Sequence, residues 1–169
     1  MSEDPRAVLL VEDNDDDAEL TIRGLKRANL QNQLDVAHDG QEALDYLLGT
    51  AEQPPRRIPA VVLLDLKLPR IDGLEVLKRI RTDVRTQRMP VVILTSSSED
   101  GDLVNGYDLG ANSYVCKPIQ FDEFTRAIEQ LGVYWLTINK SAPSADDDPP
   151  PAATREFSAH DYEARREHS

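Results

Sequence analysis

Four short apolar segments in this sequence are each followed by side chains that could bind a cation or a phosphate. These side chains are Glu12 and Asp13, Asp65, Thr95, and Lys117. Grouped carboxylates repel one another unless a cation relieves them, and oxygen ligands that leave room for water and a phosphate oxygen favour Mg²⁺. We predict a pocket in which Asp65 is the nucleophile for a phosphoryl group. Lys117 and the metal would offset the phosphoryl charge, and Thr95 would hydrogen-bond one of its oxygens.

The apolar segments predict the strands that position these residues. Val8–Val11, Val61–Leu64 and Val91–Leu94 are continuously apolar, which is typical of strands buried on both faces of a parallel sheet. Tyr114–Cys116 is a fourth apolar run. Leu34–Ala37 alternates apolar and polar residues, so we expect an edge strand there.

Helix-like stretches separate the strands. They cover Asp15–Ala28, Gln41–Leu48, Gly73–Ile80, roughly Glu99–Leu109, and Phe121 to about Ile138. Strand and helix alternate five times, which predicts an α/β fold: a five-stranded parallel sheet, doubly wound, with helices on both faces. Ligands of such sheets gather beyond the carboxyl ends of the strands, so the five side chains should meet in one crevice.

Each of these residues has an ordinary structural explanation when it is taken alone. Glu12 and Asp13 could extend an acidic turn, because Asn14 is placed to cap the first helix and residues 15–17 are aspartates that complement its dipole. Thr95 could be a turn residue and Lys117 a solvated loop lysine. Their joint occurrence, in this order at the strand ends, favours the pocket.

Composition narrows the class of protein. A formal net charge of −12 argues against nucleic acid, and the basic segment Arg79–Arg88, interrupted by Asp83, fits a solvated loop. Cys116 is the only cysteine, no signal peptide is visible, and no apolar run is long enough to cross a membrane. These features predict a cytoplasmic protein without a membrane segment.

The composition changes after Asn139. Residues 1–139 carry the alternating strands and helices, and we expect them to form one domain. Residues 140–169 are acidic and rich in proline, which predicts a disordered tail.

Four segments together resemble the bacterial response-regulator receiver (CheY-like) family over roughly Ala7–Leu131. They are Val8–Asp13, Leu63–Gly73, Pro90–Thr95 and Gly110–Pro118. The resemblance implies the flavodoxin-like fold with strand order 2-1-3-4-5. It also implies two-component signalling, in which Asp65 accepts a phosphoryl group from a histidine kinase or phosphotransfer protein.

The same resemblance assigns further roles. The backbone carbonyl of Lys67 would join Glu12, Asp13 and Asp65 around Mg²⁺. Thr95 and Tyr114 would form a switch pair, with the tyrosine turning inward when Thr95 is drawn to the phosphoryl group. The peptide bond between Lys117 and Pro118 would be cis, as proline allows.

Within the family, the chain is similar to the single-domain regulators of bacterial phytochrome-type histidine kinases. The similarity lies in the Glu12-Asp13-Asn14 opening, the long proline-containing loop Gly49–Pro59, the segment Asp65–Pro69, and the end Gly132–Leu136. It implies a kinase of that type as the partner.

The last predicted helix carries more apolar residues than the sheet could cover. Phe121, Phe124, Ile128, Leu131, Trp135 and Ile138 form one stripe at helical spacing. Beyond Gly132 the helix would outrun the sheet, and unpartnered apolar surface favours an interface. We predict a homodimer through the fourth and fifth helices, held by Tyr134 and Trp135. The alternative is that Gly132 ends the helix and the aromatic residues fold back over the core.

Two other functions compete with a signalling switch. One is an aspartyl-phosphate phosphatase or phosphotransferase of the haloacid-dehalogenase kind, which resembles this chain in its strand-end Asp and Mg²⁺. Such enzymes carry a second Asp two residues after the nucleophile, and here that residue is Lys67. The other is a receiver that has lost its chemistry, against which all five pocket residues argue. We therefore expect a switch and not an enzyme.

Overall fold

The computed structural model describes residues 5–118 and 120–143, and these contain a five-stranded parallel sheet. The strands are β1 (Val8–Val11), β2 (Leu34–Ala37), β3 (Val61–Leu64), β4 (Val91–Thr95) and β5 (Ser113–Cys116). Their order is β2-β1-β3-β4-β5, and every neighbouring pair is parallel. The predicted fold class and strand order are confirmed.

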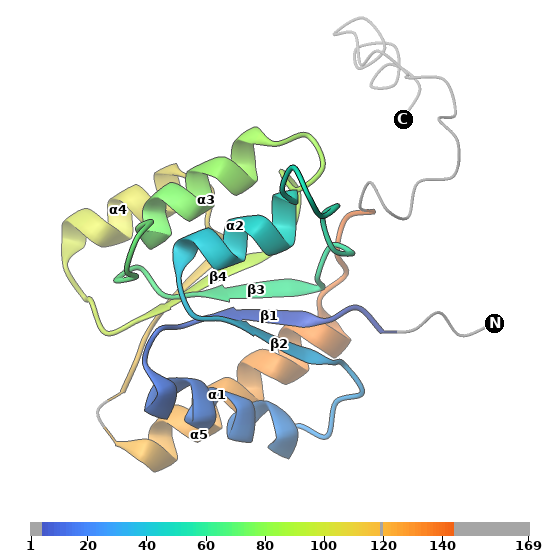
Figure 1. The fold of residues 1–169 in the computed structure, drawn as a ribbon. Helices are drawn as coiled ribbons and strands as arrows, with labels where there is room; N and C mark the ends of the chain where they lie inside the picture. Colours follow the sequence, from blue (N-terminus) through green and yellow to red (C-terminus); the bar gives the residue numbers. More distant parts are fainter. Residues whose placement is uncertain (1–4, 119, 144–169) are drawn as a thin grey trace, which may run out of the picture.

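Helices cover both faces of the sheet (Figure 1). They are α1 (Asp15–Arg27), α2 (Gly40–Leu48), α3 (Gly73–Thr82), α4 (Asp100–Asp108) and α5 (Phe121–Val133), and α5 continues into the π-helical turn η1 (Tyr134–Ile138). Helices α2, α3 and α4 lie on one face, and α1 and α5 lie on the other. This is the doubly wound arrangement that the alternating pattern predicts.

The strands build two apolar cores because successive side chains point to opposite faces. In β1, Leu9 and Val11 join the core under α2 and α3, whereas Val8 and Leu10 join the core under α1 and α5. All four are buried. Burial on both faces explains why this strand reads as a continuous apolar run.

Helices α1 and α5 lie against each other at Gly24. A Cβ atom built there would be 2.7 Å from the Cβ of Ile128, so only glycine permits this approach. Asn14 caps α1 as predicted, because its side chain accepts a hydrogen bond from the amide of Asp17 at 3.0 Å. Helix α1 is therefore held at its N-terminal cap and, near its C-terminal end, on its packed face.

The C-terminal helical segment combines the two arrangements that the sequence left open. Gly132 does not end the helix, and Trp135 packs against the core under α1 and α5. Tyr134 is 46% exposed, and its ring meets that of Trp135 edge to face at 5.1 Å. The predicted apolar stripe is buried only in its middle, because Phe121 and Ile138 at its ends are exposed.

The described residues say nothing of most of the predicted tail, since 144–169 lie outside them. Across residues 5–118 and 120–143, no helix has both the length and the apolar character that crossing a bilayer requires.

Candidate functional site

Hydrogen bonds between neighbouring strands continue one residue past the strand ends and fix the predicted site residues. The amide of Glu12 donates to the carbonyl of Ala37 at 3.0 Å, and that of Asp65 donates to Val11 at 3.1 Å. The amide of Lys117 donates to the carbonyl of Thr95 at 2.8 Å. These bonds extend the hydrogen-bonding pattern of the sheet to the backbone of Glu12, Asp65 and Lys117.

Helix α3 begins directly against Asp65. A Cβ atom on Gly73 would lie 2.2 Å from the carbonyl oxygen of Asp65, so only glycine fits there. The amide of Gly73 donates to the carbonyl of Leu66 at 3.0 Å, and that of Lys67 donates to Asp65 Oδ1 at 3.3 Å. This close turn explains the Asp-Gly pair at residues 72–73 and orients the carboxylate of Asp65.

The ammonium of Lys117 lies at the centre of the pocket. Its Nζ donates to Glu12 Oε1, to Asp65 Oδ2 at 3.1 Å, and to Asp17 Oδ2 at 2.9 Å. Glu12 is 2% exposed and Asp65 is 8% exposed. The predicted convergence of Glu12, Asp65 and Lys117 is therefore present in the structure.

Asp17 is a partner that the sequence analysis missed. We assigned it, with its two acidic neighbours, to the dipole of α1. The sequence holds no signal that separates Asp17 from Asp15 and Asp16, because all three suit the first turn of a helix.

The electrostatics of the pocket follow from burial of like charges around one ammonium. Burial, together with hydrogen bonding to Asp65, raises the pKa of Glu12 to about 8. Burial also opposes ionisation of Asp65, but hydrogen bonding with Glu12 and the charge of Lys117 lower its pKa overall. Burial opposes the charged form of Lys117, yet its bonds with Glu12 and Asp17 raise its pKa above the ordinary value. Asp65 is thus kept ionised, as a nucleophile must be.

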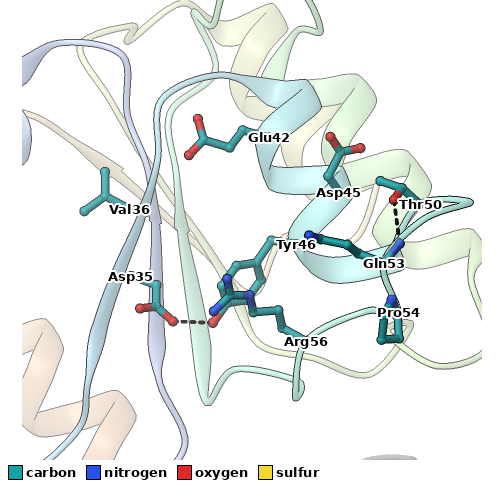
Figure 2. A pocket seen from close by; sticks show the side chains of 9 residues that line it. All are labelled: Asp35, Val36, Glu42, Asp45, Tyr46, Thr50, Gln53, Pro54 and Arg56. Carbon is teal, nitrogen blue, oxygen red and sulfur yellow. Dashed lines mark hydrogen bonds between the residues drawn. The ribbon is translucent and has the colours of Figure 1, made fainter.

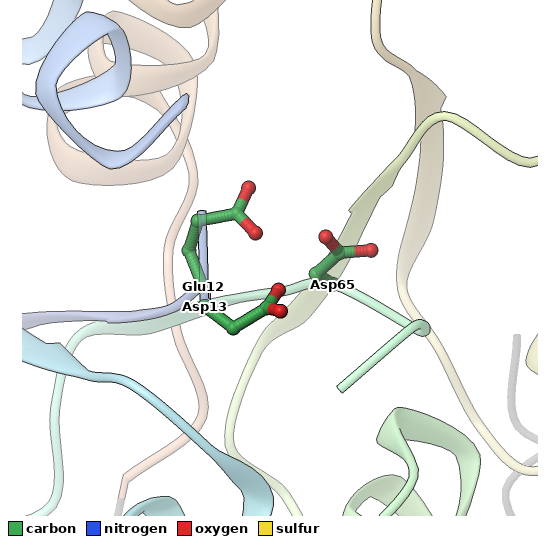
Figure 3. A group of neighbouring side chains, drawn as sticks. All are labelled: Glu12, Asp13 and Asp65. Carbon is green, nitrogen blue, oxygen red and sulfur yellow. The ribbon is translucent and has the colours of Figure 1, made fainter. Parts of the chain in front are cut away.

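The acidic residues fit a divalent metal ion. Ligand oxygens of Glu12, Asp13 and Asp65 lie within 4.8 Å of one another, and their side chains converge from the ends of β1 and β3 (Figure 3). Glu12 Oε2 is buried and has no hydrogen-bond partner among the described residues. A buried carboxylate oxygen without a donor is costly, and a bound cation would satisfy it.

Thr95 and Tyr114 meet at a shared residue, Ser97. Thr95 is fully buried, and its Oγ1 accepts a hydrogen bond from the amide of Ser97 at 3.4 Å. The hydroxyl of Tyr114 donates to the carbonyl of Ser97 at 2.8 Å, and the Ser97 hydroxyl donates to Asp102 of α4 at 2.5 Å. The two predicted switch residues are thus linked through a serine that the sequence analysis did not single out.

The prediction of a cis peptide bond before Pro118 is wrong. No cis bond occurs within the described segments, so the bond between Lys117 and Pro118 is trans. The trans form is the intrinsically preferred isomer by about 0.5–1 kcal/mol even before proline.

A second hollow, of about 340 Å³, lies between β2, α2 and the loop that follows α2 (Figure 2). Several of the side chains that line it contact one another. The hydroxyl of Tyr46 donates to Asp35 at 2.6 Å, and the guanidinium of Arg56 lies 5.6 Å from the centre of the Tyr46 ring. These contacts tie the loop to β2 and indicate a structural role.

Comparisons with known proteins agree with this geometry. The sequence profile of the response regulator receiver domain matches residues 8–129. FilR2 from Methanothrix harundinacea is 43% identical over 140 residues, which cover 83% of this chain and 90% of FilR2. Response regulator Rcp1 from Synechocystis sp. is 35% identical over 137 residues, which cover 80% of this chain and 92% of Rcp1.

Solved structures give the same result. The Mn²⁺-bound form of Rcp1 superposes with a TM-score of 0.76 at 33% identity, covering 82% of this chain and 100% of that one. The bacteriophytochrome response regulator AtBRR is 50% identical, with a TM-score of 0.64 and coverages of 82% and 100%. Profile, relatives and fold agree, and the profile spans the whole pocket: the chain belongs to the response-regulator receiver family of two-component signalling proteins.

Proposed function

We propose that this domain accepts a phosphoryl group on Asp65 from a histidine kinase and changes its interaction surface in response. The observation that carries the proposal is the position of the Asp65 carboxylate. An oxygen of this carboxylate lies within 4.8 Å of a carboxylate oxygen of Glu12 and of Asp13, which is close enough to share a metal ion. Its Oδ2 is 3.1 Å from the Lys117 ammonium. The nucleophile, the metal ligands and the ammonium group therefore lie around the place where the phosphoryl group would bind.

The residues divide the chemistry among them. An oxygen of Asp65 attacks phosphorus, the P–N bond to the donor histidine breaks with its electron pair left on nitrogen, and an acyl phosphate forms. Lys117 donates hydrogen bonds to the phosphoryl oxygens, and Thr95 lies on the neighbouring strand end to do the same. Mg²⁺, held by Glu12, Asp13, Asp65 and the backbone carbonyl of Lys67, would offset the phosphoryl charge when bound.

We further propose that the surface of α4, β5 and α5 reads out this event. Phosphorylation adds about two negative charges beside Thr95. The link from Thr95 through Ser97 to Tyr114 and Asp102 connects the pocket to β5 and α4. Movement of Thr95 toward the phosphoryl group would therefore loosen or shift this link.

The proposed donor is a phytochrome-type histidine kinase, and the proposed compartment is the cytoplasm. Support for the donor comes from the similarity to AtBRR, which is a bacteriophytochrome response regulator. The chemistry of Asp65 does not depend on this choice, so phosphotransfer from a panel of purified kinases tests the partner separately.

The proposed homodimer uses α4 and α5 with β5. Val104 and Tyr107 of α4 and Tyr134, which directly follows α5, have exposed apolar side chains. Trp135 contributes indirectly, because it packs on the core and holds the ring of Tyr134. Light scattering should give the mass of a dimer at tens of micromolar, and Tyr134→Ser should shift it toward the monomer. A wild-type monomer at that concentration would rule out the interface.

Beryllofluoride and acetyl phosphate test the central proposal. With Mg²⁺, wild type should gain the mass of one phosphoryl group from acetyl phosphate and bind beryllofluoride, whereas Asp65→Asn should do neither. Repeated turnover of the phosphodonor without accumulation of modified protein would indicate an enzyme instead. Modification of Asp65→Asn at the wild-type rate would place the acceptor elsewhere.

A further inference from the structure

Every hydrogen of the Lys117 ammonium is engaged by a carboxylate. An ammonium carries three N–H donors, and Lys117 has three acceptors: Glu12, Asp17 and Asp65. The acceptors come from three different places, namely the end of β1, the first turn of α1 and the end of β3. A phosphoryl oxygen that is to receive a hydrogen bond from this lysine must therefore displace one of them.

The three acceptors differ in what else they do. Glu12 and Asp65 belong to the group of oxygens that fits a metal ion, and Asp65 is also the proposed nucleophile. Asp17 is outside that group, and its side chain is 36% exposed, whereas that of Lys117 is 8% exposed. The contact to Asp17 is therefore the one nearest to water and the one that the phosphoryl chemistry does not otherwise use.

The position of Asp17 is fixed by the helix that carries it. Its amide donates to the cap residue Asn14, and its carbonyl accepts a hydrogen bond from the hydroxyl of Thr21 at 2.8 Å. The same helix is seated on α5 at Gly24. These contacts hold the backbone of Asp17 in place, so a Lys117 ammonium that moves toward a phosphoryl group would leave its contact with Asp17.

We propose that Asp17 is a positioning residue that competes with the phosphoryl group for Lys117. The inference rests on the proposed function of Asp65. With Asp17 in place, the Lys117 ammonium is held toward α1 and is less available to a bound anion. This competition weakens the bound anionic state, so Asp17 restrains the extent to which the domain occupies its phosphorylated form.

The test is the affinity for beryllofluoride, measured by isothermal titration calorimetry at saturating Mg²⁺. Asp17→Asn keeps the size of the side chain and an acceptor oxygen but removes the charge, and it should tighten binding about fivefold, which corresponds to about 1 kcal/mol. The matched control is Asp16→Asn, which removes the same charge from the neighbouring, exposed position in the same turn. Its effect should be smaller than twofold.

A double-mutant cycle separates action through the lysine from a general change in charge. In a Lys117→Met background, Asp17→Asn should leave the affinity for beryllofluoride unchanged. A gain that persists without the lysine, an equal gain in Asp16→Asn, or unchanged or weaker binding in Asp17→Asn would each overturn the inference. Failure of wild type to bind beryllofluoride would instead overturn the proposed function of Asp65, so the two failures are distinguishable.

Discussion

Replacing Lys117 by methionine should destabilise the domain by about 3 kcal/mol in the absence of divalent metal. The ammonium is buried, and Asp17 and Asp65 lie 2.9 and 3.1 Å from it. At an effective dielectric constant of about 20, one such contact amounts to roughly 5 kcal/mol before desolvation is subtracted. Removal of one partner from a buried ion pair costs about 3–5 kcal/mol. The pKa of Glu12 is raised to about 8, so this carboxyl can hold a proton when the ammonium is removed. The expected loss of stability therefore lies at the lower end of that range.

Urea unfolding at pH 7 in EDTA, followed by circular dichroism, measures this loss. Lys78→Met is the control, since Lys78 is exposed on α3 and its replacement should change stability by less than about 0.5 kcal/mol. Replacing EDTA by MgCl₂ should return part of the loss in Lys117→Met, because a metal ion supplies positive charge to the same carboxylates. A loss below about 1 kcal/mol in EDTA would refute the view that the carboxylates depend on this ammonium.

Two further predictions concern regions away from the pocket. Tyr46→Phe should cost about 1–2 kcal/mol at pH 8, because the bond to the Asp35 carboxylate is lost. Burial and that bond raise the pKa of Tyr46, so its contribution is complete below the unfolded pKa of about 10 and falls as the pH rises above it. The stability of wild type should therefore drop more steeply between pH 9 and 11 than that of Tyr46→Phe, and parallel curves from urea melts would contradict this. Gly24→Ala should destabilise by about 1–2 kcal/mol, since the clash with Ile128 outweighs the gain in helix propensity. The control is Gly101→Ala, where the added methyl group meets no atom within 4 Å. This variant should be more stable than wild type by about 0.5–1 kcal/mol. Equal urea midpoints for the two variants would show that the close approach of α1 and α5 is unimportant.

The fold was predictable because the inner strands are apolar along their whole length, apart from Thr95 at the end of β4. Val8–Val11 and Val61–Leu64 have the predicted bounds, and only the ends of other elements move, such as β4, which includes Thr95. Two-sided burial leaves no place for a charged residue within such strands, so in β1 and β3 the first charge marks the strand end. The same rule places Glu12 and Asp65 side by side.

What could not be predicted depends on contacts between segments far apart in the chain. Asp15, Asp16 and Asp17 are identical in type and all suit the start of a helix, and only the packing of α1 against the sheet turns the third toward Lys117. The position of Trp135 was equally hard to predict, because an aromatic residue at the end of an amphipathic helix can pack in a core or in an interface. The choice is made by the core under α1 and α5, which extends far enough to receive it.

Trp135 is also an intrinsic fluorescent probe that senses one end of the sheet and not the other. It is the only tryptophan, and it lines a hollow with Arg6 and Ala60, the residues that precede β1 and β3. That rim is at the opposite end of the sheet from Asp65, and the length of a strand, about 13–17 Å, separates the two. Its fluorescence emission should change when the domain unfolds or when α5 moves on the sheet. Binding of a metal ion in the acidic pocket should by itself leave the emission spectrum unchanged. A spectral change on loading would therefore report a rearrangement that crosses the whole sheet.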